Sequence, residues 1–301
     1  MRNSGRWRAR HSRCAGRVPV AAGRGGRIPA VPELRTTTLV DAPLRTVAAA
    51  LLDARLLTRA VRGLGVRIAG AEPVLFVGAT LAGSVGPVNG RLVVTRADTT
   101  GVSAELVGGP LPRFSLVTDL LHTGGGTMVV DSVEWTSPGG PFGRLADVLV
   151  GRGLALKVLE ARAAAVSRRS VELVSARVVV AAAIIRDGLL LAQQRSYPPE
   201  AAGRWELPGG RVEPGETDEE AVIRECAEEL GVTVTPGEPV GPDVPLRPDL
   251  VLRAYTATLT SGTPTAVEHR ATRWLSSTDL PTVDWLPADR ALLPSLHPHL
   301  P

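Results

Sequence analysis

The sequence predicts an α+β chain in which two domains follow a basic N-terminal segment. Three observations support this prediction: a length of 301 residues, a series of β-rich segments closed by one long helical segment, and a second αβ pattern that begins near residue 171. A chain of this length is long enough for two cores of ordinary domain size. We place a disordered leader at residues 1–34, a first domain at 35–170 and a second domain at 171–301.

The distribution of charge, the apolar segments and the cysteine content argue against nucleic-acid-binding, membrane-spanning and disulfide-linked proteins. Residues 1–30 contain eight arginines and no acid; because the whole chain has a net charge of +4, residues 31–301 have a net charge of −4. A mildly acidic folded part argues against a nucleic-acid polymer as partner. The apolar run Val178–Ile185 is too short to span a membrane, and two cysteines, Cys14 and Cys226, do not form a disulfide framework. We therefore expect a cytoplasmic protein without a membrane partner.

The first domain begins with a strand and a helix. Thr36–Val40 alternates weakly between polar and apolar residues, as a strand does. Pro43 is suited to open a helix. One face of that helix has the apolar residues Val47, Leu51, Leu52 and Leu56.

Strands and a long helix complete this domain. Between about residues 66 and 136, β-rich segments are separated by glycine turns, and the pair Phe114–Thr123 and Thr127–Thr136 is predicted to form a hairpin. The segment from Phe142 to about Arg169 has helical spacing and is predicted to form one long helix, kinked near residues 151–153. A strand, a helix, several strands and a long final helix form a helix-grip layout.

This layout resembles the START-like (SRPBCC, polyketide cyclase/dehydrase) superfamily over about residues 36–169. The stretches Asp131–Trp135 and Gly143–Asp147 are the most similar ones. The resemblance implies a cavity between sheet and long helix that binds an apolar small molecule; a packed domain without a ligand is the alternative. His122, the only histidine of this domain, is expected to be structural.

The second domain begins with a hairpin and contains a spaced set of glycine, arginine and glutamate residues. The hairpin is predicted from the turn Arg186-Asp187-Gly188 between two apolar segments. The spaced pattern is glycine, five residues, glutamate, seven residues, then Arg-Glu-apolar-any-Glu-Glu-any-Gly-apolar. Its positions are filled by Gly210, Glu216, Arg224, Glu225, Cys226, Glu228, Glu229, Gly231 and Val232. Chance produces such a match in about one chain in a million.

The spaced pattern also predicts a capped helix. Thr217 and Glu220 form a capping-box pair at its start, and Gly231 ends it. The residues expected to enter the core are Ala221, Cys226, Ala227 and Leu230. Cys226 is therefore expected to be a small buried residue rather than a nucleophile.

The other face of this helix is acidic. Glu225, Glu228 and Glu229 lie at positions i, i+3 and i+4, so their charges repel one another in the absence of a cation. Carboxylates with room for water suit Mg²⁺, which binds a few carboxylates together with the phosphates of a substrate. We expect Glu216 to pair with Arg224 and to brace the preceding loop against the helix.

Residues 210–232 resemble the signature of the Nudix hydrolases, and the likeness extends over about residues 176–296. The segments Leu191–Arg195, Gly203–Gly210, Glu268–Trp274 and Asp284–Asp289 are similar to the MutT branch, especially to its CTP pyrophosphohydrolases. The resemblance implies an α/β/α sandwich with a mixed sheet. It also implies Mg²⁺, replaceable by Mn²⁺, with the Gly209 carbonyl and Glu268 as ligands in addition to the three glutamates; Gly210, Glu216, Arg224 and Gly231 would be structural.

The same likeness assigns substrate contacts. Arg195 would contact the phosphates, and Glu206 and Arg211 would also bind the substrate. Asp289 would read the base: a carboxylate accepts from an exocyclic amine such as cytosine N4, and a protonated carboxyl donates to an oxo group. A surface arginine at Arg195 and a helix N-cap at Asp289 are the alternatives.

The resulting expectation is a Mg²⁺-dependent hydrolase that converts a nucleoside triphosphate to the monophosphate and pyrophosphate. CTP, dCTP, 5-methyl-dCTP and 8-oxo-dGTP are the expected substrates, and nucleotide-pool sanitation is the expected role. Glu225 is the expected base, with Glu268 as the alternative. The rival hypotheses are a regulator, in which the first domain binds an apolar molecule and the second senses a nucleotide, and a pyrophosphatase for nucleotide sugars or dinucleotides. The sequence gives no indication of the oligomeric state.

Overall fold

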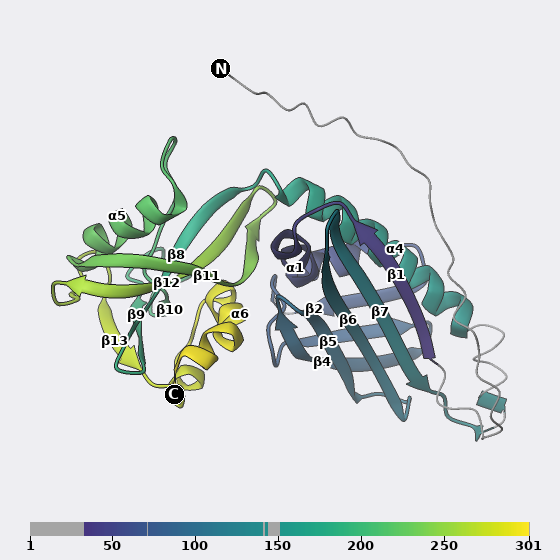
Figure 1. The fold of residues 1–301 in the computed structure, drawn as a ribbon. Coiled ribbons are helices and arrows are strands. Elements are labelled where there is room, and N and C mark those ends of the chain that lie inside the picture. The colour runs from purple at the N-terminus through teal and green to yellow at the C-terminus, as the bar shows by residue number, and fades with distance from the viewer. Residues whose placement is uncertain (1–32, 71, 141, 144–150, 301) are drawn as a thin grey trace, which may run out of the picture. The chain divides into compact units, whose positions relative to one another are not determined.

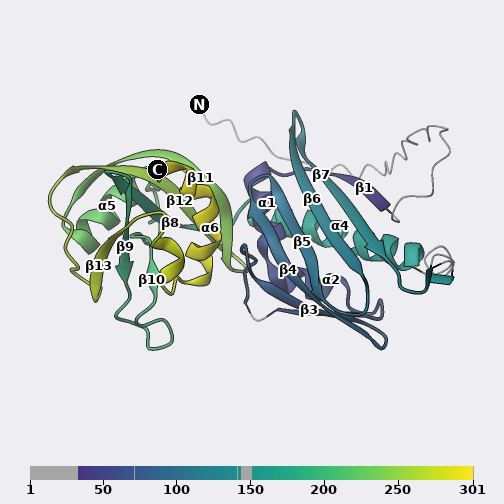
Figure 2. The ribbon, with the colours of Figure 1, turned by 90° about the horizontal axis from the view of Figure 1, so that it is seen from below.

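Two β-sheets form the framework of the protein (Figures 1 and 2). The structure, a computed structural model, describes residues 33–70, 72–140, 142–143 and 151–300. Within these residues the N-terminal sheet has seven strands in the order β1-β7-β6-β5-β4-β3-β2. The second sheet has six strands, in the order β10-β9-β8-β12-β11 with β13 paired to β9. The predicted mixture of α and β structure is confirmed.

The N-terminal sheet is antiparallel throughout. Its strands are β1 (Glu33–Val40), β2 (Val66–Gly70), β3 (Thr80–Val85), β4 (Val88–Asp98), β5 (Gly101–Gly108), β6 (Arg113–Thr123) and β7 (Gly126–Thr136). The helices of this part are α1 (Leu44–Leu52), α2 (Ala54–Ala60) and α4 (Arg152–Leu173). The two short helices lie between β1 and β2 in the chain, and α4 contacts α1, α2, β1 and β7. The predicted order of strand, helical segment, strands and long helix is therefore present, as is the hairpin of β6 and β7.

The helical segments differ from prediction in one place. The helix expected after Pro43 is divided at Asp53, whose carboxylate accepts a hydrogen bond from the backbone N–H of Arg55 and so begins a second helix. For the long helix expected from Phe142, the structure describes helical backbone at residues 142–143 and α4 from Arg152 onward, so a single helix across this range stays a prediction. Residues 144–150, which include most of the stretch Gly143–Asp147, lie outside the described residues, as do residues 1–32 of the leader. The last two residues of the expected leader, Glu33 and Leu34, are instead the start of β1, where they pair with β7.

A buried ion pair joins α4 to the N-terminal sheet. The guanidinium of Arg162 on α4 donates to the carboxylate of Asp131 on β7, and both side chains are almost fully buried. The Thr118 hydroxyl on β6 donates to the same carboxylate at 2.6 Å. Because a buried charge without a partner is strongly destabilising, these three groups fix α4 against the sheet at one position.

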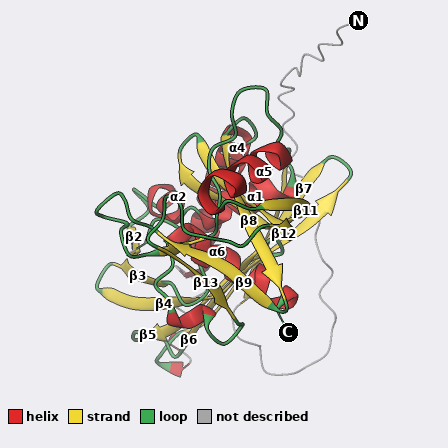
Figure 3. Ribbon diagram, turned by 90° about the vertical axis from the view of Figure 1, so that its left-hand side faces the viewer, coloured by secondary structure: helices red, strands yellow, loops and turns green. Residues whose placement is uncertain are grey.

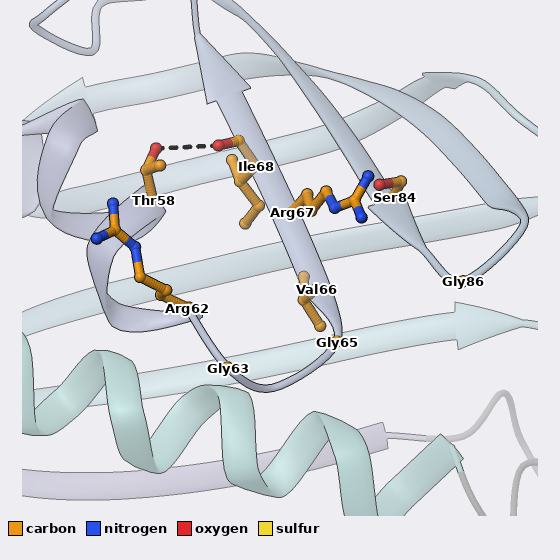
Figure 4. A pocket seen from close by; sticks show the side chains of 9 residues that line it. All are labelled: Thr58, Arg62, Gly63, Gly65, Val66, Arg67, Ile68, Ser84 and Gly86. Atoms are coloured by element: carbon orange, nitrogen blue, oxygen red, sulfur yellow. Dashed lines mark hydrogen bonds between the residues drawn. The ribbon is translucent and has the colours of Figure 1, made fainter.

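A pocket of about 610 Å³ lies at the β2 edge of the N-terminal sheet (Figure 4). Val66 and Ile68 contribute apolar surface, and Arg62 and Arg67 contribute guanidinium groups. Thr58 also lines the pocket, and its hydroxyl donates to the Ile68 carbonyl at 3.0 Å. None of the residues that line this pocket belongs to α4, so the apolar cavity expected between the sheet and the long helix, and its apolar ligand, stay a prediction.

The second sheet is mixed, because β12 pairs with β8 in parallel while its other strands pair antiparallel. Its strands are β8 (Arg177–Arg186), β9 (Leu189–Gln194), β10 (Trp205–Glu206), β11 (Thr233–Arg247), β12 (Leu250–Ser261) and β13 (Ala271–Leu275). The helical segments here are α5 (Asp218–Leu230), η2 (Leu280–Thr282), α6 (Pro287–Leu296) and η3 (His297–His299). The expected hairpin joins β8 and β9 through Asp187 and Gly188, which have φ angles of 53° and 73°. Positive φ at both positions is the conformation of a two-residue hairpin turn.

Helices cover both faces of the central strand β8 (Figures 1 and 3). Val180, Ala182 and Ile184 pack in the same core cluster as α5. Ala181 and Ala183 point to the opposite face and pack in the cluster that contains α6. A strand that is buried on both faces is apolar at every position, which explains the run Val178–Ile185. The sheet with a helix on each face is the expected α/β/α sandwich.

Two further expectations concern the chain as a whole. None of the helices in the described part is long and apolar enough to cross a membrane. The domain boundary placed near residue 171 falls in the last turn of α4, and β8 begins at Arg177. The division into two domains stays a prediction.

Candidate active site

A glycine loop between β10 and α5 brings backbone atoms close to the acidic helix. A side chain at Gly210 would occupy the space of the Glu225 carboxylate, and one at Gly209 (φ 151°) would collide with the Val180 carbonyl. The carbonyls of Pro208 and Gly210 accept hydrogen bonds from the backbone of β8. In the described part of the chain no hydrogen bond to the Gly209 carbonyl between them is found. That carbonyl oxygen is therefore available as a ligand, and its expected role in binding a metal stays a prediction.

Helix α5 has the predicted ends. The Thr217 hydroxyl accepts from the Glu220 backbone N–H, and the Glu220 carboxylate accepts from the Thr217 backbone N–H, which completes the capping box. Gly231 ends the helix in the left-handed conformation with a φ of 67°. Cys226 is fully buried, and this burial raises its pKa to about 12, so it is a core residue as expected. Ala227, which was expected in the core, is exposed. Val222, which was not expected there, is buried in the core instead.

Arg224 organises the outer part of the acidic face. Its guanidinium forms the expected pair with Glu216 through two hydrogen bonds of 2.9 and 3.0 Å. The same guanidinium donates to Glu225 at 2.9 Å and to Glu228 at 3.0 Å. Repulsion among the carboxylates is therefore offset partly by an arginine, a compensation that the charge pattern alone did not predict. The hydrogen bond from Arg224 lowers the pKa of Glu216, whereas burial raises the pKa of Glu225.

Glu229 turns inward from the same helix. Its side chain is almost fully buried, and its Oε2 accepts from the backbone N–H of Gly209 at 2.9 Å and from Nε2 of Gln193 at 2.7 Å. Burial raises the pKa of Glu229, and the two donated hydrogen bonds oppose that rise. Nδ1 of His269 lies 3.8 Å from the other oxygen, Oε1.

The three glutamates fit a divalent cation in their chemistry. In the described part of the chain no three His, Cys, Asp or Glu side chains converge closely enough to hold a metal ion by themselves. Carboxylate oxygens with one backbone carbonyl are nevertheless the donors that Mg²⁺ takes, and this ion keeps several of its ligands as water or phosphate oxygens. The donor set is therefore suited to an open site completed by a substrate.

A second chain of polar contacts runs beside Glu229. Arg195, expected to meet the phosphates, donates to both oxygens of Glu206 at 2.7 and 2.8 Å. His269 Nε2 lies 2.8 Å from Glu206 Oε1, so Glu206 connects Arg195 to His269. Glu268, an expected outlying ligand, is exposed, and its backbone carbonyl accepts from the Ser196 hydroxyl.

Asp289 is buried and does not cap its helix. Leu286 occupies the N-cap position of α6, so the alternative interpretation of Asp289 as an N-cap was wrong. Its Oδ1 instead accepts from the backbone N–H of Leu207 at 2.9 Å, and its relative exposure is 4%. Burial, assisted by the nearby charge of Glu206, raises the pKa of Asp289 to about 8. The carboxyl is thus held largely protonated at neutral pH.

Arg211, expected to bind the substrate, is exposed next to the glycine loop. Its backbone carbonyl accepts from Arg224 at 2.9 Å. Gln193 and His269 were not predicted as site residues. His269 follows the singled-out Glu268, and that neighbourhood was the one signal for it; Gln193 lies in an apolar strand and contacts Glu229 only through the fold.

Residues 175–296, which contain the glycine loop and α5, match a known protein family and several known proteins. The model of the family described as NUDIX domain matches residues 175–296. A Mycobacterium tuberculosis protein named "Putative 8-oxo-dGTP diphosphatase 2" is 49% identical over 123 residues, which cover 40% of this chain and 87% of that protein. The chain belongs to the Nudix hydrolase family. It is therefore a hydrolase of phosphoric anhydride bonds, and Nudix hydrolases generally use divalent cations such as Mg²⁺.

Other known proteins are similar to this Nudix hydrolase over about the same fraction of its length. The CTP pyrophosphohydrolase of Escherichia coli is 42% identical over 118 residues, which cover 38% of this chain and 87% of the relative. Among solved structures, that of the E. coli ORF135 protein is 36% identical with a TM-score of 0.36, covering 40% of this chain and 89% of that one.

Proposed function

We propose that this Nudix hydrolase is a Mg²⁺-dependent nucleoside triphosphate pyrophosphohydrolase. The observation that supports it most is the placement of the α5 carboxylates against the glycine loop: Glu225 beside Gly210 and Glu229 on the Gly209 N–H. Water and a nucleoside triphosphate would yield the monophosphate and pyrophosphate. A Mg²⁺ bound by Glu225, Glu228, Glu229 and the Gly209 carbonyl, with Glu268 as an outlying ligand, would neutralise phosphate charge and lower the pKa of the attacking water.

Glu225 is the proposed general base, and Glu268 is the alternative. The pKa of Glu225 is raised by burial, which moves it toward the range in which a carboxylate accepts a proton from water at neutral pH. Glu268 is exposed and lies next to the half-buried His269. Exchange of each glutamate for glutamine separates the two assignments: the variant that lacks the base loses kcat over the whole pH range.

The proposed substrates are CTP, dCTP, 5-methyl-dCTP and 8-oxo-dGTP, with nucleotide-pool sanitation as the role. The relatives named for CTP and for 8-oxo-dGTP support this group. Asp289 supports it as well, because Oδ1 is used by the Leu207 N–H and leaves Oδ2 for the base. A protonated Oδ2 donates to a ring nitrogen or oxo group, and an ionised one accepts from an amine. The proposed contacts to the phosphates are those of Arg195 and Arg211, with Glu206 holding Arg195 in place.

A hydrolysis panel tests this function. Purified protein with Mg²⁺ is offered the proposed nucleotides, the four standard deoxynucleotides, a nucleotide sugar and a dinucleotide, and the products are separated by ion-exchange chromatography. We expect pyrophosphate and monophosphate from a cytidine nucleotide or 8-oxo-dGTP. Products from the sugar or dinucleotide alone would move the assignment to another class of Nudix hydrolase.

For the N-terminal part we propose a START-like domain that binds an apolar molecule. The layout of β1, two helices, six strands and α4 supports it. The alternative to a pool-sanitation enzyme is a ligand-responsive regulator, in which this domain binds the apolar molecule and the Nudix domain senses a nucleotide. We propose a cytoplasmic location for either function. Native mass spectrometry of the purified chain tests the proposal by the mass of a co-purified apolar ligand.

A further inference from the structure

Gln193 is a fully buried amide in a strand that is otherwise apolar inside. It lies on β9 between Ala192 and Gln194, with a relative exposure of 0%. Its Nε2 donates to Glu229 Oε2 at 2.7 Å, and its Oε1 is buried without a hydrogen-bond partner among the described residues. A buried amide with an unpaired oxygen destabilises a fold, and an apolar side chain of similar size would fill this position at lower cost. The bond to Glu229 is therefore what this side chain adds.

That bond settles which oxygen of Glu229 stays free. Oε2 accepts hydrogen bonds from two donors: the Gln193 amide of strand β9 and the Gly209 backbone N–H of the glycine loop. Oε1 accepts no hydrogen bond in the described structure; His269 Nδ1 lies 3.8 Å from it and is itself buried without a partner among the described residues. The carboxylate is thus fixed in rotation, with one oxygen saturated and the other available.

We propose that Gln193 is a positioning residue of the metal site, which orients Glu229 so that Oε1 is the oxygen offered to a divalent cation. The inference rests on the proposed function, because it takes Glu229 to be a metal ligand. Groups that orient a ligand in this way typically change metal affinity or activity 10–100-fold when they are removed. Gln193 acts through Glu229 and touches neither substrate nor cation.

The neighbouring residue provides a matched control. Gln194 lies on the same strand, and its Nε2 donates to the Gly203 carbonyl at 2.7 Å, away from Glu229. Gln193→Met and Gln194→Met thus remove one side-chain amide each, with little change in volume. Only the first change releases Glu229.

The test measures Mn²⁺ binding to the full chain without nucleotide, by the electron paramagnetic resonance signal of free Mn²⁺. We expect Gln193→Met to raise the Mn²⁺ Kd about 10–100-fold and Gln194→Met to leave it within about twofold of wild type. In a nucleotide assay, Gln193→Met should raise the Mg²⁺ concentration for half-maximal rate, with a smaller change in kcat at saturating Mg²⁺. The Gln193→Met/Glu229→Gln double variant should bind Mn²⁺ no more weakly than Glu229→Gln alone.

The outcomes separate the two proposals. Wild-type Mn²⁺ affinity in a folded Gln193→Met protein, while Glu229→Gln loses affinity, overturns the role of Gln193 and leaves the proposed function intact. A wild-type chain that binds no Mn²⁺ and hydrolyses no nucleotide overturns both. If Gln193→Met does not fold, wild-type protein is used instead, and the NMR signals of the Gln193 and Gln194 side-chain amides are followed. The Gln193 signal should shift more than the Gln194 signal when Mg²⁺ is added. Equal shifts, or none, would contradict the proposal.

Discussion

The carboxylate of Glu225 lies in the space that a side chain at Gly210 would fill. This relationship links the glycine loop to the acidic helix, because it permits a charged group of α5 to approach the backbone. A displacement of about 1 Å at a reacting group can cost about a hundredfold in rate. The size of residue 210 should therefore govern catalysis.

Gly210→Ala is expected to reduce kcat about a hundredfold by pushing Glu225 away from the loop. Steady-state kinetics at saturating Mg²⁺ measures this loss. Gly124→Ala is the control, because a Cβ at Gly124 meets open space. Unchanged kcat in a folded Gly210→Ala protein would show that the position of Glu225 is irrelevant to the reaction.

Arg224→Gln is expected to lower the melting temperature and to make it more sensitive to Mg²⁺. The substitution removes the cation that contacts Glu216, Glu225 and Glu228, so their repulsion increases. Mg²⁺ should then raise the Tm of the variant by more than it raises that of wild type, as measured by differential scanning calorimetry. Arg177→Gln, which breaks an exposed pair with Asp249, serves as control. Equal Mg²⁺ responses in all three proteins would argue against a link between Arg224 and the metal face.

Asp289 should make stability fall as pH rises. Its pKa is about 8 in the folded protein and about 3.9 in an unfolded chain. The folded state therefore keeps a proton that the unfolded state has lost between these values, and the stability present below about pH 4 is lost as pH rises through about 8. Each pH unit in this window corresponds to about 1.4 kcal/mol.

Urea unfolding of wild type and Asp289→Asn between about pH 5 and 8 measures this dependence, since asparagine does not titrate. The free-energy difference between the two proteins should change with pH in favour of the variant. Asp284→Asn, at an exposed aspartate, serves as the control for the substitution itself. A constant difference for Asp289→Asn as well would mean that the Asp289 carboxyl titrates in its ordinary range.

The same carboxyl should also make base preference depend on pH. Below its pKa, Oδ2 donates and favours an oxo group such as O6 of 8-oxoguanine; above it, Oδ2 accepts and favours the cytosine N4 amine. The ratio of kcat/KM for dCTP to that for 8-oxo-dGTP should therefore increase between about pH 6 and 9.5. Because both substrates use the same catalytic groups, the pH dependence of those groups cancels in the ratio of the two kcat/KM values. Asp289→Asn should flatten the profile, and an equally steep profile in that variant would exclude Asp289 as the base reader.

Local patterns of the sequence predicted local structure well. The capping box of α5, its glycine end and the hairpin turn at Asp187 and Gly188 depend on residues within a few positions of each other, and all were predicted. The division of the first helix at Asp53 was missed, because the apolar spacing continues through it to Leu56.

The contacts of the site depend on chain segments far apart in sequence. Asp289 meets Leu207 across 82 residues, and Gln193 meets Glu229 across 36, so neither partner is visible in a local pattern. Arg195 is a similar case: the family resemblance assigned it to the substrate phosphates, and its hydrogen bond to Glu206, 11 residues away in sequence, was not predicted. The residue types of the acidic face were predictable, whereas their orientation was set by Arg224 and by the buried strand β9.

Pyrophosphate release by wild type and Glu229→Gln tests the central claim most directly. Both proteins are given the best nucleotide of the panel with and without Mg²⁺, and folding is verified by circular dichroism. The wild type should release pyrophosphate only with Mg²⁺, and Glu229→Gln should be slower by at least about a hundredfold while remaining folded. Full turnover by folded Glu229→Gln, or turnover by wild type in EDTA, would contradict a metal site built on α5.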